Sequence, residues 1–422
     1  MNEAFYPEEE IFESLKDFED RKENILVPKF GEVTPLFLDQ KFTEKSAFPT
    51  IQIGKLPERL ALIQGGMGSA VSTGEMAGQV AKLEGIGTTT AVMFGMEQGQ
   101  KNEEIVKKEL IHARSIAGEN SNNVVGVNIM HALKDYKKLV EIAIKNGAQF
   151  LTVGAGLPLD LAKLTKDYPN VALLPIVSGG RATKAILGAW AKTNRKPDAI
   201  IYENPLLAGG HEGGKLNEIL ADSPQYFYRY GLAQVFDTLS KFGQEIGDSS
   251  YQDIPVIAAG GINPDDLLYI FNLTNSRGQR VAGVQVATPF LTTDTAGIPY
   301  NAVQKDVDAN EKFIQIHLEN KKIGLIKSTA GLMPGRVLLN DFVNEIQEME
   351  GTVRKRIQGC VDCLKKNYCQ FEKTQWCIMQ RLLKTIKGET EKGLPFTGRR
   401  PQHFGKTTID EVIQRYKTVF QN

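Results

Sequence analysis

The sequence lacks the features that mark secreted, membrane-spanning and nucleic-acid-binding proteins. It has no apolar run long enough to cross a bilayer, and its acidic N-terminus has no hydrophobic core like that of a secretory signal. Lysine plus arginine and aspartate plus glutamate each number 50, so the net charge is zero and no basic face for a nucleic acid is indicated. These absences predict a soluble, cytoplasmic protein without a nucleic-acid or membrane partner.

Cysteine is also scarce, and all of it lies in one short stretch near the C-terminal end. The four residues have the spacing C-x2-C-x5-C-x7-C and are Cys360, Cys363, Cys369 and Cys377. Such clustering argues against a disulfide framework and predicts a metal or cluster site. Structural zinc sites usually show two tight pairs, whereas the spacing in iron–sulfur sites varies more. A 4Fe–4S cluster is therefore favoured over zinc, and three nearby lysines would offset its negative charge, namely Lys365, Lys366 and Lys373.

Eight short apolar runs alternate with helical patterns through the middle of the chain. The runs occupy residues 59–64, 85–90, 124–129, 148–153, 171–177, 198–202, 254–259 and 281–287. Continuous apolar strands separated by helices predict a parallel sheet that is covered on both faces. Eight units over roughly 230 residues suit a closed (β/α)8 (TIM) barrel of about 250 residues better than the alternative, an open doubly wound sheet.

The regions around these runs divide the chain into three parts. Residues 1–50 form a polar N-terminal extension, and residues 51–340 form the barrel with a looser insertion near 290–335. Residues 341–422 are helical, basic and carry the cysteines. The expected fold is thus α/β, a TIM barrel with an N-terminal extension and a C-terminal helical Cys-rich segment.

Glycines follow the first strand, at the end of a barrel where active sites are assembled. The sequence there is Gly65-Gly66-Met67, and glycine lets the backbone approach a flat ligand closely. A tight turn before a helix that is capped by Ser72 or Thr73 is the purely structural alternative. The third strand contains Asn128, whose amide needs a partner when buried, either a bound cofactor or the neighbouring backbone.

The last two strands lead into segments that suit a phosphate group. The seventh strand runs into Gly260-Gly261, and the eighth runs through Gln285, Val286 and Ala287 to Thr288. In a TIM barrel the loops after these two strands commonly form the phosphate site. Paired glycines expose amides and a threonine adds a hydroxyl, so the two segments together predict a phosphorylated cofactor or substrate.

One histidine stands out among the five in the chain. His211 lies among four glycines after the sixth strand, and a histidine in such a loop suits proton transfer near neutral pH. The structural alternative is a loop histidine bonded to backbone. His131, which follows the third strand, is a second and weaker candidate.

The ordered motifs GGMG…VST, GVNI, AGGH-x-G, AAGGI and Q-x-A-T-x-F resemble the 2-nitropropane dioxygenase-like FMN barrels. This family includes nitronate monooxygenases and the flavin-type enoyl-acyl carrier protein reductase II. The resemblance covers residues 51–342 and implies that His211 is the catalytic histidine. It also implies noncovalent FMN, surrounded by Met67, Asn128, Glu203, Gly209, Gly261 and residues 285–288. The segment after Glu203 departs from the usual family sequence.

The C-terminal cysteines resemble those of a subgroup typified by the bacterial decanoyl-acyl carrier protein dehydrogenase/isomerase. This resemblance implies an FMN- and 4Fe–4S-dependent oxidoreductase of medium-chain acyl thioesters in unsaturated fatty acid synthesis. Its partner would be acyl carrier protein or a small-molecule substrate. The acyl chain would lie against Phe290, Ile298, Tyr300 and Val303.

Three other functions stay open at this point. A nitronate monooxygenase and an NAD(P)H-dependent enoyl-acyl carrier protein reductase would share the barrel and its flavin. A zinc-stapled module that binds carrier protein is an alternative outside the enzymes. The sequence also leaves the oligomeric state open, a homodimer included.

Overall fold

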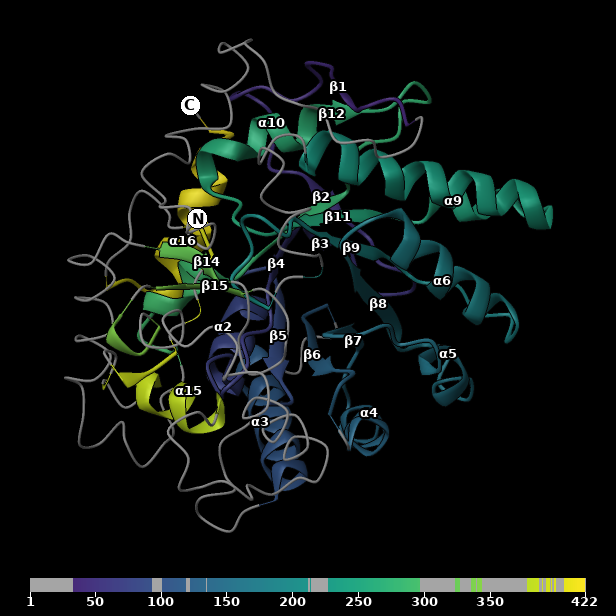
Figure 1. Ribbon diagram of the computed structural model, residues 1–422. Coiled ribbons are helices and arrows are strands. Elements are labelled where there is room, and N and C mark those ends of the chain that lie inside the picture. Colours follow the sequence, from purple (N-terminus) through teal and green to yellow (C-terminus); the bar gives the residue numbers. More distant parts are fainter. Residues whose placement is uncertain are drawn as a thin grey trace, which may run out of the picture.

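A computed structural model gives the fold of the protein (Figure 1). It describes residues 33–92, 101–118, 122–133, 135–211, 213, 227–296, 323–326, 335–338, 340–343, 378–386, 389, 392–394, 396, 398–399 and 406–421. The four cysteines lie outside the described residues, as do most of the N-terminal extension and most of the insertion.

Eight parallel strands close into a barrel. They are β4 (Leu62–Gln64), β5 (Ile86–Thr90), β6 (Val124–Met130), β7 (Phe150–Gly154), β8 (Ala172–Val177), β9 (Ile200–Glu203), β11 (Val256–Ala259) and β13 (Gly283–Val286). Each pairs with the next, and β13 pairs with β4 to complete the ring. All eight coincide with the apolar runs expected from the sequence, and β6, β7 and β9 each extend one residue beyond their run. The predicted TIM barrel is therefore confirmed, and the open sheet is excluded.

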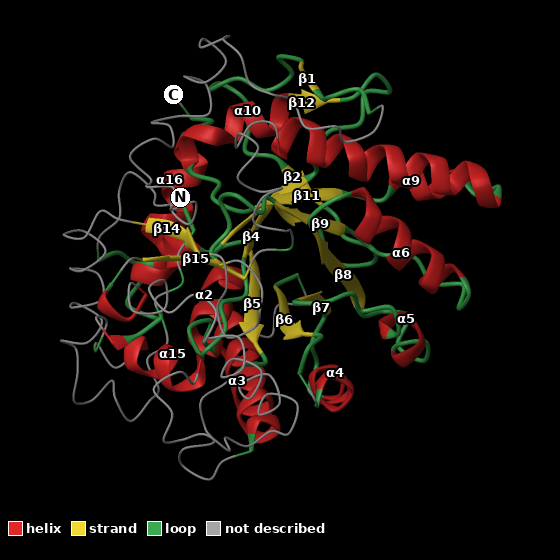
Figure 2. Ribbon diagram, in the orientation of Figure 1, coloured by secondary structure: helices red, strands yellow, loops and turns green. Residues whose placement is uncertain are grey.

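Helices surround this ring of strands (Figure 2). They are α2 (Gly74–Lys82), α3 (Asn102–Ala117), α4 (Tyr136–Lys145), α5 (Leu161–Leu164), α6 (Gly180–Ala191), α9 (Leu232–Ile246) and α10 (Leu267–Asn272). Short helical turns precede two of them, η3 (Phe227–Gly231) before α9 and η5 (Pro264–Asp266) before α10. Two more adjoin strands: η4 (Ser249–Asp253) precedes β11, and η6 (Thr288–Thr292) follows β13. None of the helices in the described stretches is long and apolar enough to cross a membrane.

The first helix shows how closely the layers pack. Thr73 caps α2, because its hydroxyl accepts a hydrogen bond from the Met76 amide at 3.1 Å. A Cβ placed on Gly74 would lie 2.2 Å from the Glu109 carbonyl oxygen of α3, so only glycine permits this approach. The helix cap expected at Ser72 or Thr73 is thus formed by Thr73.

Small antiparallel sheets complete the fold. A hairpin of β2 (Thr50–Ile51) and β3 (Arg59–Leu60) leads into the barrel, and β1 (Phe37–Leu38) pairs with β12 (Leu273–Thr274). A third sheet has the order β10 (Gly210–His211), β15 (Gly335–Leu338) and β14 (Ile323–Ile326). The C-terminal helices α15 (Ile378–Ile386) and α16 (Ile409–Thr418) lie beside the α2 side of the barrel, away from α5 and α6 (Figure 1).

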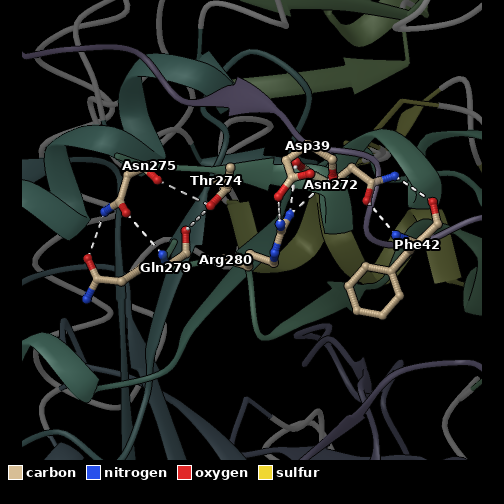
Figure 3. A network of polar contacts seen from close by, with 7 residues as sticks. All are labelled: Asp39, Phe42, Asn272, Thr274, Asn275, Gln279 and Arg280. Carbon is tan, nitrogen blue, oxygen red and sulfur yellow. Dashed lines mark hydrogen bonds and ion pairs between the residues drawn. The ribbon is translucent and has the colours of Figure 1, made fainter. Parts of the chain in front are cut away.

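A polar network joins the N-terminal segment to the connection that enters β13 at its N-terminal end (Figure 3). We call it the Asn272 network, and its members are Asp39, Phe42, Asn272, Thr274, Asn275, Gln279 and Arg280. The Asn272 carboxamide accepts from the Phe42 amide and donates to the Phe42 carbonyl, both at 2.8 Å. Asn275 donates to Gln279 Oε1 at 2.7 Å. Arg280 forms an ion pair with Asp39. These bonds fix residues 39–42 against a part of the chain that is 230 positions away.

Candidate active site

Strand register decides which side chains face the inside of the barrel. Successive side chains on a strand alternate between the two faces, and paired residues on parallel strands share a face. A Cβ on Gly87 would lie 1.9 Å from the Ala77 carbonyl oxygen of α2, so Gly87 faces outward and Thr88 inward. Following the register around the ring places a set of inward residues at the carboxyl ends of the strands, which we call the barrel mouth: Gly65, Thr90, Asn128, Thr152, Glu203, Ala259 and Gln285.

The loop after β4 is held from beneath by an outward-facing amide. Gln64 is fully buried and donates to Ser72 Oγ at 2.8 Å, while its Oε1 accepts from the Thr88 amide at 3.0 Å. Ser72 Oγ in turn accepts from the Met67 amide at 2.8 Å. Gly65 donates to the Val286 carbonyl at 2.7 Å. These bonds set the course of the predicted Gly65–Met67 segment over the barrel mouth.

Asn128 lies directly beneath that loop. A Cβ on Gly66 would lie 2.2 Å from Asn128 Cβ, so Gly66 is required for the loop to pass over this side chain. Asn128 Nδ2 donates to Thr152 Oγ1 at 3.1 Å. Its carboxamide oxygen has no partner among the described residues and is available to a ligand.

Gln285, Val286 and Ala287 at the end of β13 take different positions. Gln285 is 7% exposed, and its Oε1 is buried without a hydrogen-bond partner in the described part of the chain. A buried acceptor in this state is costly unless a ligand or water completes it. Val286 points outward into the core, and Ala287 lies beside Gly65, where a Cβ would approach it to 3.1 Å. The structure thus brings Gly65, Gln285, Val286 and Ala287 together.

Glu203 ends β9 and points inward. Burial raises the pKa of the Glu203 carboxyl from its usual 4.5 to about 7. No hydrogen bond or ion pair joins the carboxyl to any described residue. A carboxyl with this pKa exists in both protonation states at neutral pH, so it can hold or release a proton there.

The predicted phosphate loops are covered by a C-terminal strap, residues 396, 398 and 399. The Gly398 amide donates to Thr288 Oγ1 at 3.1 Å, and the Arg399 amide donates to the Leu207 carbonyl at 2.9 Å. Gly260 and Gly261 have φ angles of +93° and +69°, and a Cβ on Gly261 would lie 2.5 Å from Leu207 Cβ. Glycine is therefore needed at both positions, because Gly260 lies against the Asn204 backbone and Gly261 lies against Leu207 and Arg399.

A buried ion pair anchors this strap. Arg399 Nη1 donates to Asp266 Oδ2 at 2.7 Å, and the two side chains are 7% and 1% exposed. Burial raises the pKa of the Asp266 carboxyl, and the Arg399 guanidinium opposes that shift. Sequence reasoning did not find this pair, because its members are 133 positions apart and belong to no common motif.

His211 lies in a connection that returns to the barrel. Its backbone pairs with Gly335 in the β10–β15 ladder, and two residues later the Gly213 carbonyl accepts from Ser178 Oγ at 2.9 Å. Ser178 directly follows β8, the neighbour of β9. Gly209 lies next to the strap, where a Cβ on Gly398 would come within 3.2 Å of the Gly209 amide nitrogen. The chain that carries His211 therefore passes close to the strand ends.

His131, the second histidine candidate, has structural partners. Its Nε2 lies 3.8 Å from Asp160 Oδ1, and its ring contacts the Tyr136 ring at 4.8 Å. Phe290, expected to contact an acyl chain, is fully buried in the core. Ile298, Tyr300 and Val303 lie outside the described residues.

All four cysteines of the predicted metal site lie outside the described part of the chain. Within the described residues there is no group of three or more His, Cys, Asp and Glu side chains that could hold a metal ion.

The barrel mouth fits a flat polar ring with a phosphate, as FMN has. Gly65 and Gly66 place backbone rather than side chains at one edge, and Asn128 and Gln285 each offer an amide oxygen without a described partner. Such acceptors suit the N–H group of an isoalloxazine ring. Thr288, Gly260 and Gly261 lie together at the side expected for the phosphate.

Comparison with solved structures supports the same fold. FabK from Thermotoga maritima is 19% identical with a TM-score of 0.56, over 86% of this chain and 92% of that chain. A nitroalkane oxidase from Streptomyces ansochromogenes is 16% identical with a TM-score of 0.55, over 87% and 96% of the two chains. The enoyl reductase domain of MlnA, from the macrolactin biosynthesis cluster of Bacillus amyloliquefaciens, is 12% identical with a TM-score of 0.53, over 86% and 94%.

Sequence comparison assigns the family. No curated protein matches the chain, but the family model described as nitronate monooxygenase matches residues 51–413. That match spans the barrel, the His211 connection and the C-terminal strap. The protein is therefore an FMN-dependent oxidoreductase and belongs to the nitronate monooxygenase family.

Proposed function

We propose that the protein oxidises or reduces medium-chain acyl thioesters with FMN and a 4Fe–4S cluster. The carrier of the acyl chain would be acyl carrier protein or a small thiol. The observation that supports a bound flavin is the Gln285 carboxamide oxygen at the barrel mouth, which is buried and has no partner among the described residues. The four C-terminal cysteines favour an acyl dehydrogenase/isomerase over the cluster-free members of the family.

FMN, when bound, would supply the two-electron chemistry that hydride exchange at the β-carbon of the acyl chain requires. Asn128 and Gln285 would orient the ring through their amide groups, with Gly65, Gly66, Met67 and Gly209 around it. Gly260, Gly261, Ala287 and Thr288 would hold the phosphate end, while Val286 packs into the core behind them. His211 would take the α-proton during dehydrogenation and return it during reduction.

The cysteines are proposed as the ligands of the cluster. Four thiolates complete the ligand set of a 4Fe–4S cluster, and residues 341–422 would form the part of the protein that carries it. Measurement of iron, zinc and acid-labile sulfide in purified protein tests this assignment. Iron with sulfide supports the cluster, whereas zinc without sulfide supports the stapled-module alternative.

An anaerobic absorption spectrum with and without decanoyl thioester tests the whole proposal. We expect bound flavin, a cluster contribution, and bleaching of the flavin band when the thioester is added. A protein purified without flavin, or a flavin that no acyl thioester reduces, contradicts the proposal.

A nitronate monooxygenase is the second candidate, favoured by the description of the matching family. It would consume oxygen with a small nitroalkane anion and would need no cluster. An NAD(P)H-dependent enoyl reductase would instead oxidise nicotinamide rapidly when an enoyl thioester is present. Oxygen uptake and NADH consumption, measured side by side with thioester-driven flavin reduction, separate these three activities. Sedimentation of the same preparation determines whether the protein is a homodimer.

A further inference from the structure

Glu203 is the one carboxyl at the barrel mouth as the structure describes it. Its orientation follows from its neighbour, since a Cβ on Gly231 would lie 1.9 Å from the Tyr202 hydroxyl. Tyr202 therefore points outward to the start of α9, and Glu203, one residue later, points inward. In the register with β11, Glu203 is paired with Ala259. The Glu203 side chain is thus attached at the C-terminal end of β9, which is the end of the barrel where active sites are assembled.

The residues beside Glu203 carry no charge. Ala259 lies next to it on β11, and on the other side β8 presents Ile176 inward and continues into Ser178. No described cation or titratable group contributes to the electrostatics of the carboxyl, and burial is the cause of its raised pKa. Asp266 provides a contrast within the same chain, because its buried carboxyl has Arg399 as a partner. A half-buried, inward-facing carboxyl without a described partner is not explained by a contribution to stability.

The same connection carries both Glu203 and His211. From Glu203 the chain passes through the turn at Asn204–Ala208 and reaches β10 at Gly210. It then bends back so that Gly213 accepts from Ser178 Oγ at 2.9 Å, at the end of the strand beside β9. The backbone of His211 is therefore held between the β15 pairing and a contact next to β9.

We propose that Glu203 is a second acid–base residue of the active site, acting with His211 on the bound acyl thioester. This inference rests on the proposed function, because it takes an enoyl thioester as the substrate. Moving a double bond from the 2-enoyl to the 3-enoyl position breaks a carbon–hydrogen bond at carbon 4. The electron pair passes through the conjugated system to the thioester oxygen, and a new carbon–hydrogen bond then forms at carbon 2. One of the two residues, Glu203 or His211, accepts the proton from carbon 4 and the other delivers a proton to carbon 2, so that no electrons are lost or gained.

The test compares three variants with the wild type as flavin-loaded holoenzyme. Glu203→Gln removes the proton-holding group while keeping the size, Glu203→Asp restores a carboxyl, and Glu245→Gln removes an exposed carboxyl of α9 as a control. Under argon, mass spectrometry follows deuterium uptake from solvent into 2-decenoyl thioester between pH 5 and 9. Flavin fluorescence measures the FMN dissociation constant, and infrared difference spectra record protonated carboxyl groups over the same pH range.

We expect Glu203→Gln to slow deuterium uptake by at least about tenfold, within the range of general acid–base effects. The pH dependence centred near 7 should disappear, together with an infrared carboxyl band that titrates there in the wild type. Glu203→Asp should recover part of the exchange, and Glu245→Gln should match the wild type. The FMN dissociation constant should stay at the wild-type value in Glu245→Gln and should change by far less than the exchange rate in Glu203→Gln.

Two results would overturn the inference. Exchange in Glu203→Gln at the wild-type rate and with the wild-type pH profile shows that Glu203 moves no proton. A weakened FMN affinity with an unchanged pH profile shows that Glu203 only contacts the cofactor. Failure of the proposed function is distinct, because the wild type itself would then neither exchange deuterium nor reduce its flavin with any acyl thioester.

Discussion

The Asn272 network and the barrel mouth both contain buried or half-buried amide side chains, but these side chains differ in how many of their polar atoms are hydrogen-bonded. In the network, Asn272, Asn275 and Gln279 each use their carboxamide oxygen as an acceptor and their nitrogen as a donor. At the mouth, Gln285 Oε1 has no partner among the described residues, and Asn128 uses only its nitrogen. Paired amides fix one piece of chain against another, whereas unpaired ones at a strand end are left for a ligand.

Charged groups show the same contrast. Arg399 and Asp266 form a buried pair that ties the C-terminal strap to the loop after β11. Glu203, on the adjacent strand, is inward-facing and has no described cation beside it. The strap thus stabilises the fold, whereas the neighbouring Glu203 is proposed to act in catalysis. Substitutions in the strap should lower stability, and substitutions of Glu203 should change activity.

The largest effect is expected from breaking the strap. Arg399→Leu leaves the buried Asp266 carboxyl without its partner, which should lower the free energy of unfolding by about 3–5 kcal/mol. Chemical denaturation followed by circular dichroism measures the loss. The double variant Asp266→Asn with Arg399→Leu is the control and should recover most of the stability, because no unpaired charge remains. An Arg399→Leu protein as stable as the wild type would show that the pair does not anchor the strap.

Glu203 gives the next effect, through the pH dependence of stability. Its pKa is about 7 in the folded protein and about 4.5 when unfolded, so the folded state binds more protons between these values. Stability from this group is present below about pH 4.5, falls as the pH rises to 7, and stays lost above it. The loss is at most about 3 kcal/mol, reduced by water at the mouth. Glu203→Gln should lack this decline in denaturation curves taken from pH 5 to 8, and an identical decline would contradict the assignment.

Replacing glutamine by leucine at position 279, in the Asn272 network, and at position 285, at the barrel mouth, tests the difference between paired and unpaired amides directly. Gln279→Leu leaves Asn275 Nδ2 without its acceptor and the Gln252 carbonyl without its donor, and it should lower the free energy of unfolding by about 2 kcal/mol. Gln285→Leu removes an acceptor that is already unpaired, so stability should hold. FMN affinity should instead fall about tenfold in Gln285→Leu, as expected for one hydrogen bond to the ring.

Equal losses of stability in these two variants would remove the distinction between the two regions. Thermal unfolding of the flavin-free proteins and fluorescence titration with FMN supply the two measurements. Loss of FMN affinity at unchanged stability in Gln279→Leu would also contradict this distinction, because Gln279 would then serve the cofactor and not the fold.

The smallest effect belongs to the edge of the Asn272 network. The Asp39 side chain is 55% exposed, so its ion pair with Arg280 is screened by water. Asp39→Asn should change the free energy of unfolding by less than about 1 kcal/mol, and the difference should shrink at high salt. A larger loss that persists in 1 M salt would place this pair among the buried interactions.

The strands were predictable because each is a short apolar run that must be buried on both faces. Residues such as Gly66 and Asn128 were also marked by their types, a glycine at a strand end and an amide on an apolar strand. The contact between Gly66 and Asn128 was not predictable, because the distance between these residues depends on the closure of the barrel. Thr152 went unnoticed for the same reason, since only the register of β6 with β7 brings it to Asn128.

The sequence by itself determined the eight barrel strands, the helical segments between them, the glycine-rich strand ends and the family of the barrel. Local patterns carry this information, since the spacing of apolar residues and glycines acts within a few positions of the chain. Tertiary structure alone decided which polar groups are paired. It joined Arg399 to Asp266 and left Glu203 and Gln285 without described partners, because pairing depends on which distant segments meet and how much water is excluded there.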